Sequence, residues 1–457
     1  MHQGGVMITN SIILAAGKGT RMFSNQAKVL HKIGEKPLLQ HVIDATKDIV
    51  DKIHIIYGFQ GDVVRKNING EVLNWVEQIE QKGTGHAVLQ ALPFVEDNVL
   101  VLVLYGDVPL ITTQTLEDLK KQSSHSGFAI LTTQLDNPTG YGRIVRDENS
   151  KIIEIVEQKD ANTEQLNITE VNTGIMAVRS DLLKKYLKNI TPNNAQNELY
   201  LTDIIKMAVD DNIDIGFVDC LDEFEVAGVN DKKQLAQLER VFQLQCAENM
   251  MSKGLEIKDN YRFDLRGKLK FGKDCVCDIN VIFEGEVVLG ENVNIGANCI
   301  IKNSTIGDNS IIEPNSIIDN AIIEQNVVVG PFARIRPETK LKNNVKVGNF
   351  VEVKKTTIDE NSKANHLSYL GDSIVGKNVN IGAGVITCNY DGVNKHQTII
   401  EDGAFIGSDS QLIAPVKIGK NSTIGAGSSI SKDTAKDKLT LSRAKQLTIP
   451  NWQRPKK

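Results

Sequence analysis

An aliphatic residue followed by glycine recurs throughout the second half of the chain, as in Val329-Gly330, Val347-Gly348 and Ile406-Gly407. Steps of six residues join positions 329, 335, 341, 347 and 353, all of which are Val, Ile or Leu. Aliphatic side chains that point the same way at every sixth residue fit neither a helix nor an ordinary strand, but they can stack on one another in a solenoid. The period predicts a parallel β-helix with a C-terminal tail over residues 254–457, and a segment that breaks the period is expected to leave the β-helix as a loop.

The first half of the chain alternates short apolar runs with amphipathic segments. Residues 11–16, 53–57 and 99–105 are apolar, and residues 38–50 and 84–95 are amphipathic. This alternation predicts βαβ units in a mostly parallel sheet with helices on both faces, forming a domain over residues 1–228. Ligands of such sheets bind beyond the carboxyl ends of the strands, so the residues that follow each apolar run are the candidates for a site.

Helical spacing of Leu235, Leu238, Val241 and Phe242 predicts a connecting helix within residues 229–253. Asn230 stands near the start of this segment. Its side chain could serve as the N-cap of the helix or as a ligand for the preceding domain, and the sequence leaves both interpretations open.

Composition narrows the class of protein. A chain of 457 residues with 41% hydrophobic but only 5% aromatic residues suits two large domains built on aliphatic ladders and a buried parallel sheet. The net charge of −5 without a basic run predicts no nucleic-acid partner. The apolar stretch at 11–16 is too short for a signal or membrane segment, and the first ten residues lack a charged n-region, so we expect a cytoplasmic protein without a membrane partner. The scattered cysteines favour reduced structural thiols over a zinc site or disulfides.

Candidate phosphate chemistry follows two of the predicted strands. The sequence L-A-A-G-K-G-T-R-M at 14–22 supplies glycines that let backbone N–H groups approach a phosphate, and Arg21 and Lys28 supply cations. It lacks the complete dinucleotide or P-loop pattern, so a plain strand-to-helix turn is the alternative. Asp107, in Y-G-D, places a carboxylate where a phosphate-bridging Mg²⁺ would need it, or it serves as a turn residue.

The six-residue period falters at 356–373 and at 388–398, and we expect both segments to be excursions that carry chemistry. His366 lies in the first of them, and Arg336, Lys354 and Tyr369 lie close by in sequence. An imidazole beside two cations and a hydroxyl group favours a general base next to an anion site. A histidine with a purely structural role is the alternative.

Taken in order, the motifs L-A-A-G-K-G-T-R-M, G-T-G-H-A, Y-G-D, Y-G-R-I, V-N-T-G and G-V-N precede the hexapeptide pattern. Over nearly its whole length the chain closely resembles the bacterial bifunctional N-acetylglucosamine-1-phosphate uridyltransferase/glucosamine-1-phosphate acetyltransferase family. The resemblance implies an α/β nucleotidyltransferase domain with a Rossmann-like, mostly parallel sheet, followed by a left-handed parallel β-helix. It also implies two reactions that supply cell-wall synthesis. Acetyl-CoA acetylates glucosamine 1-phosphate, and UTP then converts N-acetylglucosamine 1-phosphate into UDP-N-acetylglucosamine and pyrophosphate.

The resemblance also implies roles for residues of the first domain. Lys28 and Arg21 would be catalytic and would stabilise phosphate charge, and Asp107 and Asn230 would hold Mg²⁺. Gly142, Glu157 and Asn172 would bind the sugar. The nucleotide would be bound by Leu14, Ala15, Ala16, Gly17, Lys28, Gln78, Gly83, Thr84, Tyr105, Gly106 and Asp107. The family usually has proline before this lysine, whereas this chain has Ala27, which puts the rigidity of the loop in question.

In the second domain the resemblance makes His366 the catalytic base. Glucosamine 1-phosphate would be bound by Arg336, Lys354, Tyr369 and Asn380, and acetyl-CoA by Ala383, Asn389, Tyr390, Ser408, Ala426 and Arg443. The family forms homotrimers, so we expect a homotrimer here. Two alternatives stay open: a hexose-1-phosphate nucleotidyltransferase with a purely structural or regulatory β-helix, and a trimeric scaffold without catalysis.

Overall fold

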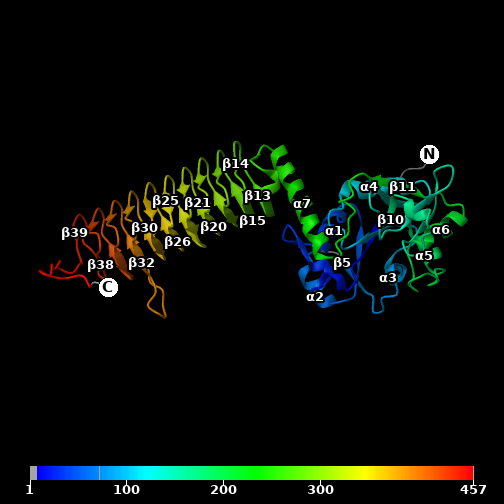
Figure 1. Cartoon of the computed structure of the whole chain (residues 1–457), viewed down its shortest axis with the longest axis horizontal. Coiled ribbons are helices and arrows are strands. Elements are labelled where there is room, and N and C mark those ends of the chain that lie inside the picture. Colours follow the sequence, from blue (N-terminus) through cyan, green and yellow to red (C-terminus); the bar gives the residue numbers. More distant parts are fainter. Residues whose placement is uncertain (1–7, 71–72, 456–457) are drawn as a thin grey trace. The chain divides into compact units, whose positions relative to one another are not determined.

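The computed structural model describes residues 8–70 and 73–455 (Figure 1). The chain divides into two compact units, Met1–Phe242 and Gln243–Lys457. The predicted domain boundary at residue 228 lies before the end of the first unit. The chain that follows residue 228, including the start of the connecting helix, still belongs to that unit.

The connecting helix is α7 (Lys232–Ser252), within the predicted segment. Leu238 of α7 is buried against Met22, Ile33 and Leu38 of the first unit. This contact explains why the first unit extends into the helix. No helix in the described part of the chain, α7 included, is long and apolar enough to cross a membrane.

The first unit is built on a mixed sheet with the strand order β11-β7-β10-β6-β1-β4-β5. The strands are β1 (Thr9–Leu14), β4 (Lys52–Tyr57), β5 (Leu73–Glu77), β6 (Leu100–Tyr105), β7 (Phe128–Gln134), β10 (Glu170–Arg179) and β11 (Gly216–Cys220), with β8 (Arg143–Arg146) and β9 (Ile152–Val156) attached to β10. Neighbours are parallel except around β10, which runs antiparallel to β6, β7 and β8, and β8 and β9 are antiparallel to each other. The predicted mostly parallel sheet is therefore present, with an antiparallel part that the hydrophobic pattern did not indicate.

Helices cover both faces of this sheet. They are α1 (Leu38–Thr46), α2 (Gly61–Asn67), α3 (Thr84–Ala91), α4 (Thr113–Ser123), α5 (Ser180–Leu187) and α6 (Asp203–Asp210), with 3₁₀ turns η1 (Thr20–Met22), η2 (Lys28–Leu30), η3 (Leu92–Phe94) and η4 (Gln165–Asn167) and the small hairpin β2 (Lys32–Ile33) and β3 (Lys36–Pro37). Adjacent residues of β1 lie in different cores. Ile12 packs with α3, α5 and α6, and Ile13 packs with α1, α2 and α4. A sheet buried on both sides explains the continuous apolar runs of the sequence.

The second unit is a three-sided parallel β-helix, and its faces are called A, B and C here. Face A holds β12 (Glu256–Ile257), β14 (Val276–Cys277), β16 (Asn294–Ile295), β19 (Ile311–Ile312), β22 (Val328–Val329), β25 (Lys346–Asn349), β28 (Lys363–His366), β31 (Asn380–Ile381), β34 (Phe405–Ile406), β37 (Thr423–Ile424) and β39 (Leu439–Thr440). The entrance to the unit also contains η5 (Asn260–Arg262), and β13 (Phe263–Lys270) and β15 (Val281–Leu289) bend around two faces.

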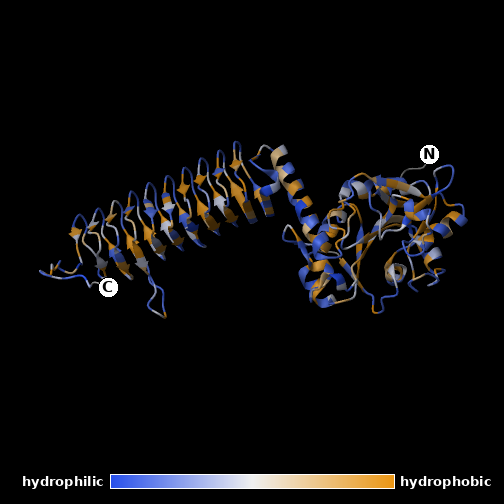
Figure 2. Cartoon of the chain, viewed as in Figure 1, coloured by the Kyte–Doolittle hydropathy of each residue, from blue (hydrophilic) through white to orange (hydrophobic). Residues whose placement is uncertain are grey.

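Along the chain, each strand of face B but the last is followed by a strand of face C, and the chain then returns to face A. Face B holds β17 (Ile300–Lys302), β20 (Ile317–Asp319), β23 (Arg334–Ile335), β26 (Glu352–Lys354), β29 (Tyr369–Gly371), β32 (Ile386–Cys388), β35 (Gln411–Ile413) and β38 (Ser429–Ile430). Face C holds β18 (Thr305–Ile306), β21 (Ala321–Ile323), β24 (Thr339–Leu341), β27 (Thr357–Ile358), β30 (Ser373–Val375), β33 (Thr398–Ile400) and β36 (Val416–Ile418). Hydrophobic residues concentrate on the strands and hydrophilic residues on the turns (Figure 2).

The six-residue period points into the core of the β-helix, as predicted. Val329, Ile335 and Leu341 are fully buried and belong to one continuous hydrophobic core. The expectation of an excursion at 356–373 is wrong, because this segment continues the coil as β27, β28, β29 and β30. The inward position of β28 is the small residue Ala364, 1% exposed, and a small inward residue hides the period without breaking it.

One segment of the second faltering stretch does leave the β-helix. Residues 389–397 lie between β32 on face B and β33 on face C and project from the corner as a loop (Figure 1). The loop is closed by an isolated bridge between Tyr390 and Lys395 and by an ion pair of 2.7 Å between His396 and Asp391. The prediction of an excursion is confirmed here.

Most corners of the β-helix turn through a residue with left-handed backbone. At the corner between faces B and C these residues are Asn303, Asn320, Glu338, Lys355 and Asp372, with φ of 44°, 47°, 63°, 46° and 48°. Asparagine and aspartate tolerate this conformation better than other residues with a side chain. Asn or Asp holds three of these five positions, whereas Glu338 and Lys355 adopt the left-handed backbone without this advantage.

All six cysteines lie among the described residues, and none forms a disulfide bond. Cys275, Cys277 and Cys299 are fully buried in the core of the β-helix. Burial raises the pKa of the Cys299 thiol to about 11. These thiols fill space in the core, in agreement with the structural role that the sequence predicts.

The buried histidine of β4 gives a prediction about stability. His54 is 1% exposed, and neither ring nitrogen has a hydrogen-bond partner in the described part of the chain. Burial lowers the pKa of His54. The charge of Glu96 raises this pKa in part, and the charge of Lys52 lowers it further. An unfolded histidine takes up a proton as pH falls below about 6.5, whereas the folded one resists protonation, so this contribution to stability is lost toward acid pH.

We therefore expect His54→Leu to raise the melting temperature of the first unit relative to the wild type as pH falls from 7 to 5. The gain should reach about 2–4 °C, the shift that about 1 kcal/mol produces in a unit of this size. Melting followed by circular dichroism at several pH values measures it. A difference between the two proteins that is constant with pH would show that protonation of His54 does not limit stability.

Candidate active sites

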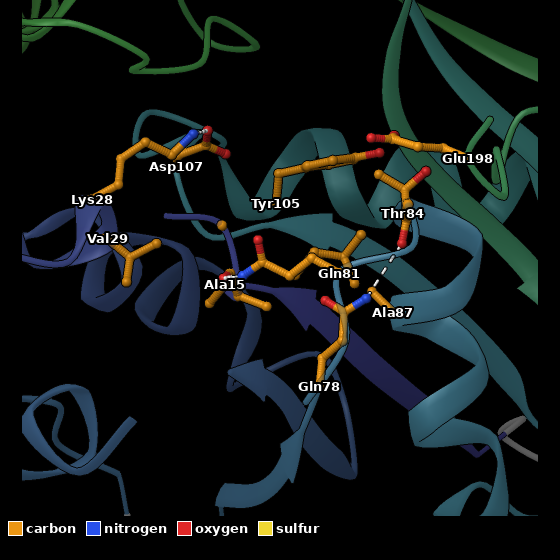
Figure 3. A pocket seen from close by; sticks show the side chains of 14 residues that line it. Ala15, Lys28, Val29, Gln78, Gln81, Thr84, Ala87, Tyr105, Asp107 and Glu198 are labelled. Atoms are coloured by element: carbon orange, nitrogen blue, oxygen red, sulfur yellow. Dashed lines mark hydrogen bonds and ion pairs between the residues drawn. The ribbon is translucent and has the colours of Figure 1, made fainter. Parts of the chain in front are cut away.

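A cavity of about 300 Å³ lies at the carboxyl ends of β1 and β6, beside the N-terminus of α3 (Figure 3). It is lined by Leu14, Ala15, Ala16, Gly17, Lys28, Val29, Gln78, Gln81, Gly83, Thr84, Ala87, Tyr105, Asp107 and Glu198. This is the edge of the sheet at which the sequence predicts a ligand. Most of the residues expected to bind nucleotide therefore surround one cavity.

Four of the lining residues have no counterpart in the sequence prediction: Val29, Gln81, Ala87 and Glu198. Gln81 Nε2 donates to the carbonyl oxygen of Ala16 at 2.6 Å, which fastens one side of the cavity to the glycine-rich turn. Glu198 is distant in sequence and carries no motif. In the fold it lies beside Gly83, because a Cβ atom built on Gly83 would lie 3.1 Å from the Cβ atom of Glu198.

The turn before α3 requires glycine. Gly83 has φ 105°, and a Cβ atom at this position would lie 2.6 Å from the carbonyl oxygen of Leu199. Gln78 is 5% exposed and directs its amide nitrogen toward the Gly83 carbonyl oxygen at 3.4 Å and toward His86 Nδ1 at 3.1 Å. The amide group of Gln78 is thus held at the floor of the cavity, where it can distinguish the polar edge of a base.

A cation and two oxygen ligands converge at the mouth of the cavity. Lys28 Nζ forms an ion pair with Asp107 Oδ2 and donates to Asn230 Oδ1 at 3.2 Å. Asp231, not Asn230, caps α7, because its Oδ1 atom accepts from the N–H of Gln234 at 2.8 Å. The amide oxygen of Asn230 is therefore directed toward the cation, and the interpretation of Asn230 as the N-cap is wrong.

Asp107 and Asn230 fit a magnesium ion, since carboxylate and amide oxygens are ligands that Mg²⁺ accepts and an ammonium group already occupies the space between them. No cluster of three or more His, Cys, Asp or Glu side chains occurs among the described residues. An ion with two protein oxygens would complete its shell with phosphate and water, as is usual for Mg²⁺.

The predicted sugar-binding residues form a second group beside the cavity. Asn172 is 8% exposed, its N–H donates to the Gly142 carbonyl oxygen at 2.9 Å, and its Oδ1 atom accepts from the N–H of Gly174 at 3.1 Å. Gly174 has φ 83°, and a Cβ atom there would lie 2.5 Å from the Tyr105 ring. This close approach joins the group to the wall of the cavity through Tyr105.

Glu157 belongs to the same group. A Cβ atom on Gly142 would lie 3.4 Å from Glu157 Oε1, and that oxygen accepts from the Thr202 hydroxyl at 3.2 Å. Burial raises the pKa of Glu157, with the hydrogen bond from Thr202 acting in the opposite direction. Burial, followed by the charges of Glu157 and Asp107, also raises the pKa of Tyr105. Glu157 therefore joins Gly142, Asn172 and Tyr105 in one group beside the cavity.

Two predicted residues lie elsewhere. Arg21 is exposed in η1 and does not line the cavity. Gly106 is buried behind the wall of the cavity, where its N–H donates to the Leu14 carbonyl oxygen at 2.9 Å. Arg21 thus lies outside the set of residues that line the cavity, whereas Gly106 holds β6 against β1.

The loop before Lys28 is held without proline. Ala27 has φ −55° and ψ 135°, angles that a proline could adopt. Its N–H donates to Gln60 Oε1 at 2.9 Å, and Gln60 Nε2 donates to the Asn25 carbonyl oxygen at 2.7 Å. The side chain of Gln60 therefore fixes the backbone that a proline ring would otherwise restrict.

We expect Gln60→Ala to raise the KM for the expected nucleotide substrate about three- to tenfold, the value of one or two hydrogen bonds. Adding Ala27→Pro to this variant should restore the KM, because the ring restricts φ and proline has no N–H that would need the lost acceptor. Steady-state kinetics of the wild type, Gln60→Ala, Ala27→Pro and the double variant measure the coupling, with Asn67→Ala on α2 as the control. An unchanged KM in Gln60→Ala, or the absence of rescue by proline, would contradict this account.

A cluster of cations lies at the corner between faces B and C of the β-helix. Arg336 Nη1 forms an ion pair with Glu352 Oε1 at 2.7 Å. Lys354 contacts Lys395 of the excursion, and this contact, followed by burial, lowers the pKa of Lys354. Lys395 escaped the sequence analysis because no motif marks it, and only the fold of the loop brings it to Lys354. Three cations at one corner suit a phosphate group.

His366 ends β28 at the corner between faces A and B. Its Nδ1 atom lies 2.9 Å from Oδ1 of Asn349, the residue paired with it on the preceding coil. With the amide oxygen as acceptor, Nδ1 carries the proton and Nε2 keeps its lone pair, the form that a general base needs. Asn349 is a further residue that the sequence analysis missed.

The predicted acetyl-CoA residues fall into two places. Ala383, Ser408, Ala426 and Arg443 follow face A on successive coils. The Ala383 carbonyl oxygen accepts from Asp409, the Ser408 carbonyl oxygen accepts from Gly427, and Gly427 lies against Arg443. This column runs along the corner that carries His366, and Asn380 opens β31 on face A.

Asn389 and Tyr390 begin the excursion at the other corner, where Asn389 and Tyr369 both approach Gly371 and Tyr390 pairs with Lys395. Within one chain, face B therefore separates the cluster of Arg336, Lys354 and Lys395 from the column of predicted acetyl-CoA residues.

The family comparisons assign both units to transferases. Residues 11–160 match the MobA-like NTP transferase domain. Residues 266–339 and 317–391 match the GMPPB C-terminal domain, and residues 397–432 match the bacterial transferase hexapeptide, six repeats. The fold and its sites thus define a nucleotidyltransferase domain joined to a hexapeptide-repeat transferase of the left-handed β-helix class.

Curated relatives named "Bifunctional protein GlmU" match almost the whole chain. The protein of Ruthia magnifica subsp. Calyptogena magnifica is 59% identical over 98% of this chain and 99% of its own length. Those of Vesicomyosocius okutanii and Marinobacter nauticus are 58% and 52% identical, over 96% and 98% of this chain and 98% of their own lengths. The chain belongs to the GlmU family of bifunctional uridyltransferases and acetyltransferases.

Proposed function

We propose that the first unit joins UTP to N-acetylglucosamine 1-phosphate and that the second unit acetylates glucosamine 1-phosphate with acetyl-CoA. The observation that carries the first assignment is the convergence of Lys28, Asp107 and Asn230 at the mouth of the cavity. Family membership favours this function over the two alternatives of a structural β-helix and a scaffold without catalysis.

In uridylyl transfer an oxygen of the sugar phosphate forms a bond to the α-phosphorus of UTP, and the bond from that phosphorus to pyrophosphate breaks. The nucleotide lies along Leu14–Gly17 and Thr84 with its base against Gln78, and the sugar lies against Gly142, Glu157 and Asn172. Lys28, together with Arg21, neutralises the phosphates. Transfer between phosphates depends mainly on such positioning and charge neutralisation.

Asp107 and Asn230 would hold Mg²⁺, which would offset the negative charge of the phosphates. Lys28, which pairs with Asp107 in this structure, would contact the phosphates.

In acetyl transfer the amine nitrogen of glucosamine 1-phosphate forms a bond to the thioester carbonyl carbon, and the bond from that carbon to sulfur breaks. His366 Nε2 takes the proton of the amine, and CoA leaves as the thiolate. Arg336, Lys354 and Lys395 hold the phosphate of the sugar. Ala383, Asn389, Tyr390, Ser408, Ala426 and Arg443 bind acetyl-CoA.

A homotrimer would complete this second site. One chain carries its phosphate cluster and its acetyl-CoA column on different corners, so packing of corners from neighbouring copies would bring the two together. The hexapeptide repeats support this assembly. We place the enzyme in the cytoplasm, where UTP and acetyl-CoA are available.

A single assay tests the function. Purified protein is given acetyl-CoA, glucosamine 1-phosphate, UTP and Mg²⁺, and UDP-N-acetylglucosamine is detected by mass spectrometry. The product should form only when all four are present. Replacing acetyl-CoA and glucosamine 1-phosphate by N-acetylglucosamine 1-phosphate should restore it, and failure of either half-reaction would refute the assignment of that unit.

A further inference from the structure

One corner residue of the β-helix is buried. Asn303, Asn320, Glu338 and Lys355 turn the corner between faces B and C in exposed positions, whereas Asp372, at the same corner with the same left-handed backbone, is only 9% exposed. A buried carboxylate is costly unless charge or hydrogen bonds compensate it. Neither reaction described above uses this group.

The excursion 389–397 buries Asp372. It leaves the β-helix at this corner one coil later, so Asn389 is directly above Asp372, and Asn389 Nδ2 donates to Asp372 Oδ2. The backbone of Asp372 is fixed as well, since its N–H donates to the Lys354 carbonyl oxygen at 3.0 Å and its own carbonyl oxygen accepts from Thr398 at 3.2 Å. Asp372 thus contacts both ends of the excursion.

Two lysines lie near enough to Asp372 for its charge to act on both. The charge of Asp372 acts on Lys354 and on Lys395, which contact each other although both are cationic groups. Arg336, the other cation of the cluster, is already paired with Glu352. Tyr369 and Asn389 both crowd Gly371, the residue before Asp372, where a Cβ atom would lie 2.4 Å from the tyrosine hydroxyl oxygen.

We propose that Asp372 is a positioning residue of the acetyl-transfer site, which orients Asn389 for acetyl-CoA and holds Lys354 and Lys395 together for the sugar phosphate. The inference rests on the proposed acetyl-transfer function. It adds Asp372 as a residue that links Asn389, on the acetyl-CoA side of the site, to the two lysines on the sugar-phosphate side.

The proposal predicts whether removing the charge of Asp372 strengthens or weakens binding of the sugar phosphate. If Asp372 acted only as a negative charge near a phosphate site, its neutralisation would strengthen binding of the sugar phosphate. If it holds two mutually repelling lysines in place, neutralisation lets them separate and weakens binding. Asp372→Asn isolates this charge, because asparagine occupies the same corner at positions 303 and 320 with nearly the same φ and can still accept from Asn389.

The experiment compares Asp372→Asn and Asp372→Ala with the wild type in acetyl transfer. We expect Asp372→Asn to raise the KM for glucosamine 1-phosphate about tenfold or more, with a smaller change in kcat and in the KM for acetyl-CoA. Asp372→Ala also loses the contact with Asn389, so it should raise both KM values. A lower or unchanged KM for glucosamine 1-phosphate in Asp372→Asn would overturn the proposal.

Glu338→Gln is the matched control, since it removes one negative charge from an exposed position of the same corner two coils earlier. It should leave both KM values unchanged. An equal rise of the KM for glucosamine 1-phosphate in Glu338→Gln and Asp372→Asn would overturn a specific role of Asp372. Uridylyl transfer, measured on each protein, reports on folding. Loss of acetyl transfer in the wild type would refute the proposed function itself, whereas an active wild type with an equally active Asp372→Asn refutes only the inference.

Discussion

Asp107→Ala is expected to lower uridylyl transfer by about two to three orders of magnitude or more, while acetyl transfer continues at the wild-type rate. The carboxylate stands at the mouth of the cavity in contact with Lys28. In the proposed function only the reaction between phosphates uses a metal ion there. Separate assays of the two half-reactions measure the effect. Chelation of divalent ions by EDTA should reproduce it in the wild type.

Asp97→Ala serves as the control for this experiment, because Asp97 is an exposed acid of the same unit that pairs with Lys184. Both activities should persist in this variant. Equal loss of both activities in a folded Asp107→Ala protein would contradict the assignment of one reaction to each unit.

His366→Ala is expected to lower acetyl transfer by about two to four orders of magnitude, the usual contribution of a positioned general base, and to leave uridylyl transfer unchanged. The amine of the sugar is largely protonated near neutral pH and attacks a thioester only after losing a proton. The pH profile of acetyl transfer should therefore lose its acidic limb in the variant. Asn349→Ala should show a smaller loss, because it releases the ring without removing it.

Two results would decide against this role. Near-normal turnover of His366→Ala with the same acidic limb would make His366 structural. A similar loss in His125→Ala, which changes an exposed histidine of the first unit, would show that the effect is unspecific. If Arg336→Ala mainly raises the KM for glucosamine 1-phosphate, binding and proton transfer are carried by different residues.

The β-helix could be predicted from the sequence because its period is local, with one inward aliphatic residue in six. The prediction failed where Ala364 fills an inward position, since a small residue breaks the hydrophobic pattern without breaking the coil. The antiparallel strand β10 could not be predicted either. Strand direction depends on pairing with β6 and β7, which are distant in sequence, and no periodicity records it.

The cavity of the first unit and its lining could largely be predicted from the sequence, because glycines such as Gly83 are required by local backbone geometry and are visible as motifs. Lys395, Asn349 and Asp372 were not accessible. Each acts through a neighbour one or more coils away, and the register that joins them appears only in the folded β-helix. The role of Asn230 also needed the structure, which shows Asp231 as the cap of α7.

The coil of the β-helix restricts the insertions and deletions that this half of the chain can tolerate in evolution. Val329 pairs with Val347 and Ile335 with Val353, so a whole coil can be added or removed with its neighbours still in register. Each such change alters the length of the β-helix by one strand spacing, about 4.8 Å. Insertions of other lengths are accommodated only at a corner, as residues 389–397 show, and new loops in homologous chains should therefore arise at corners and not within strands.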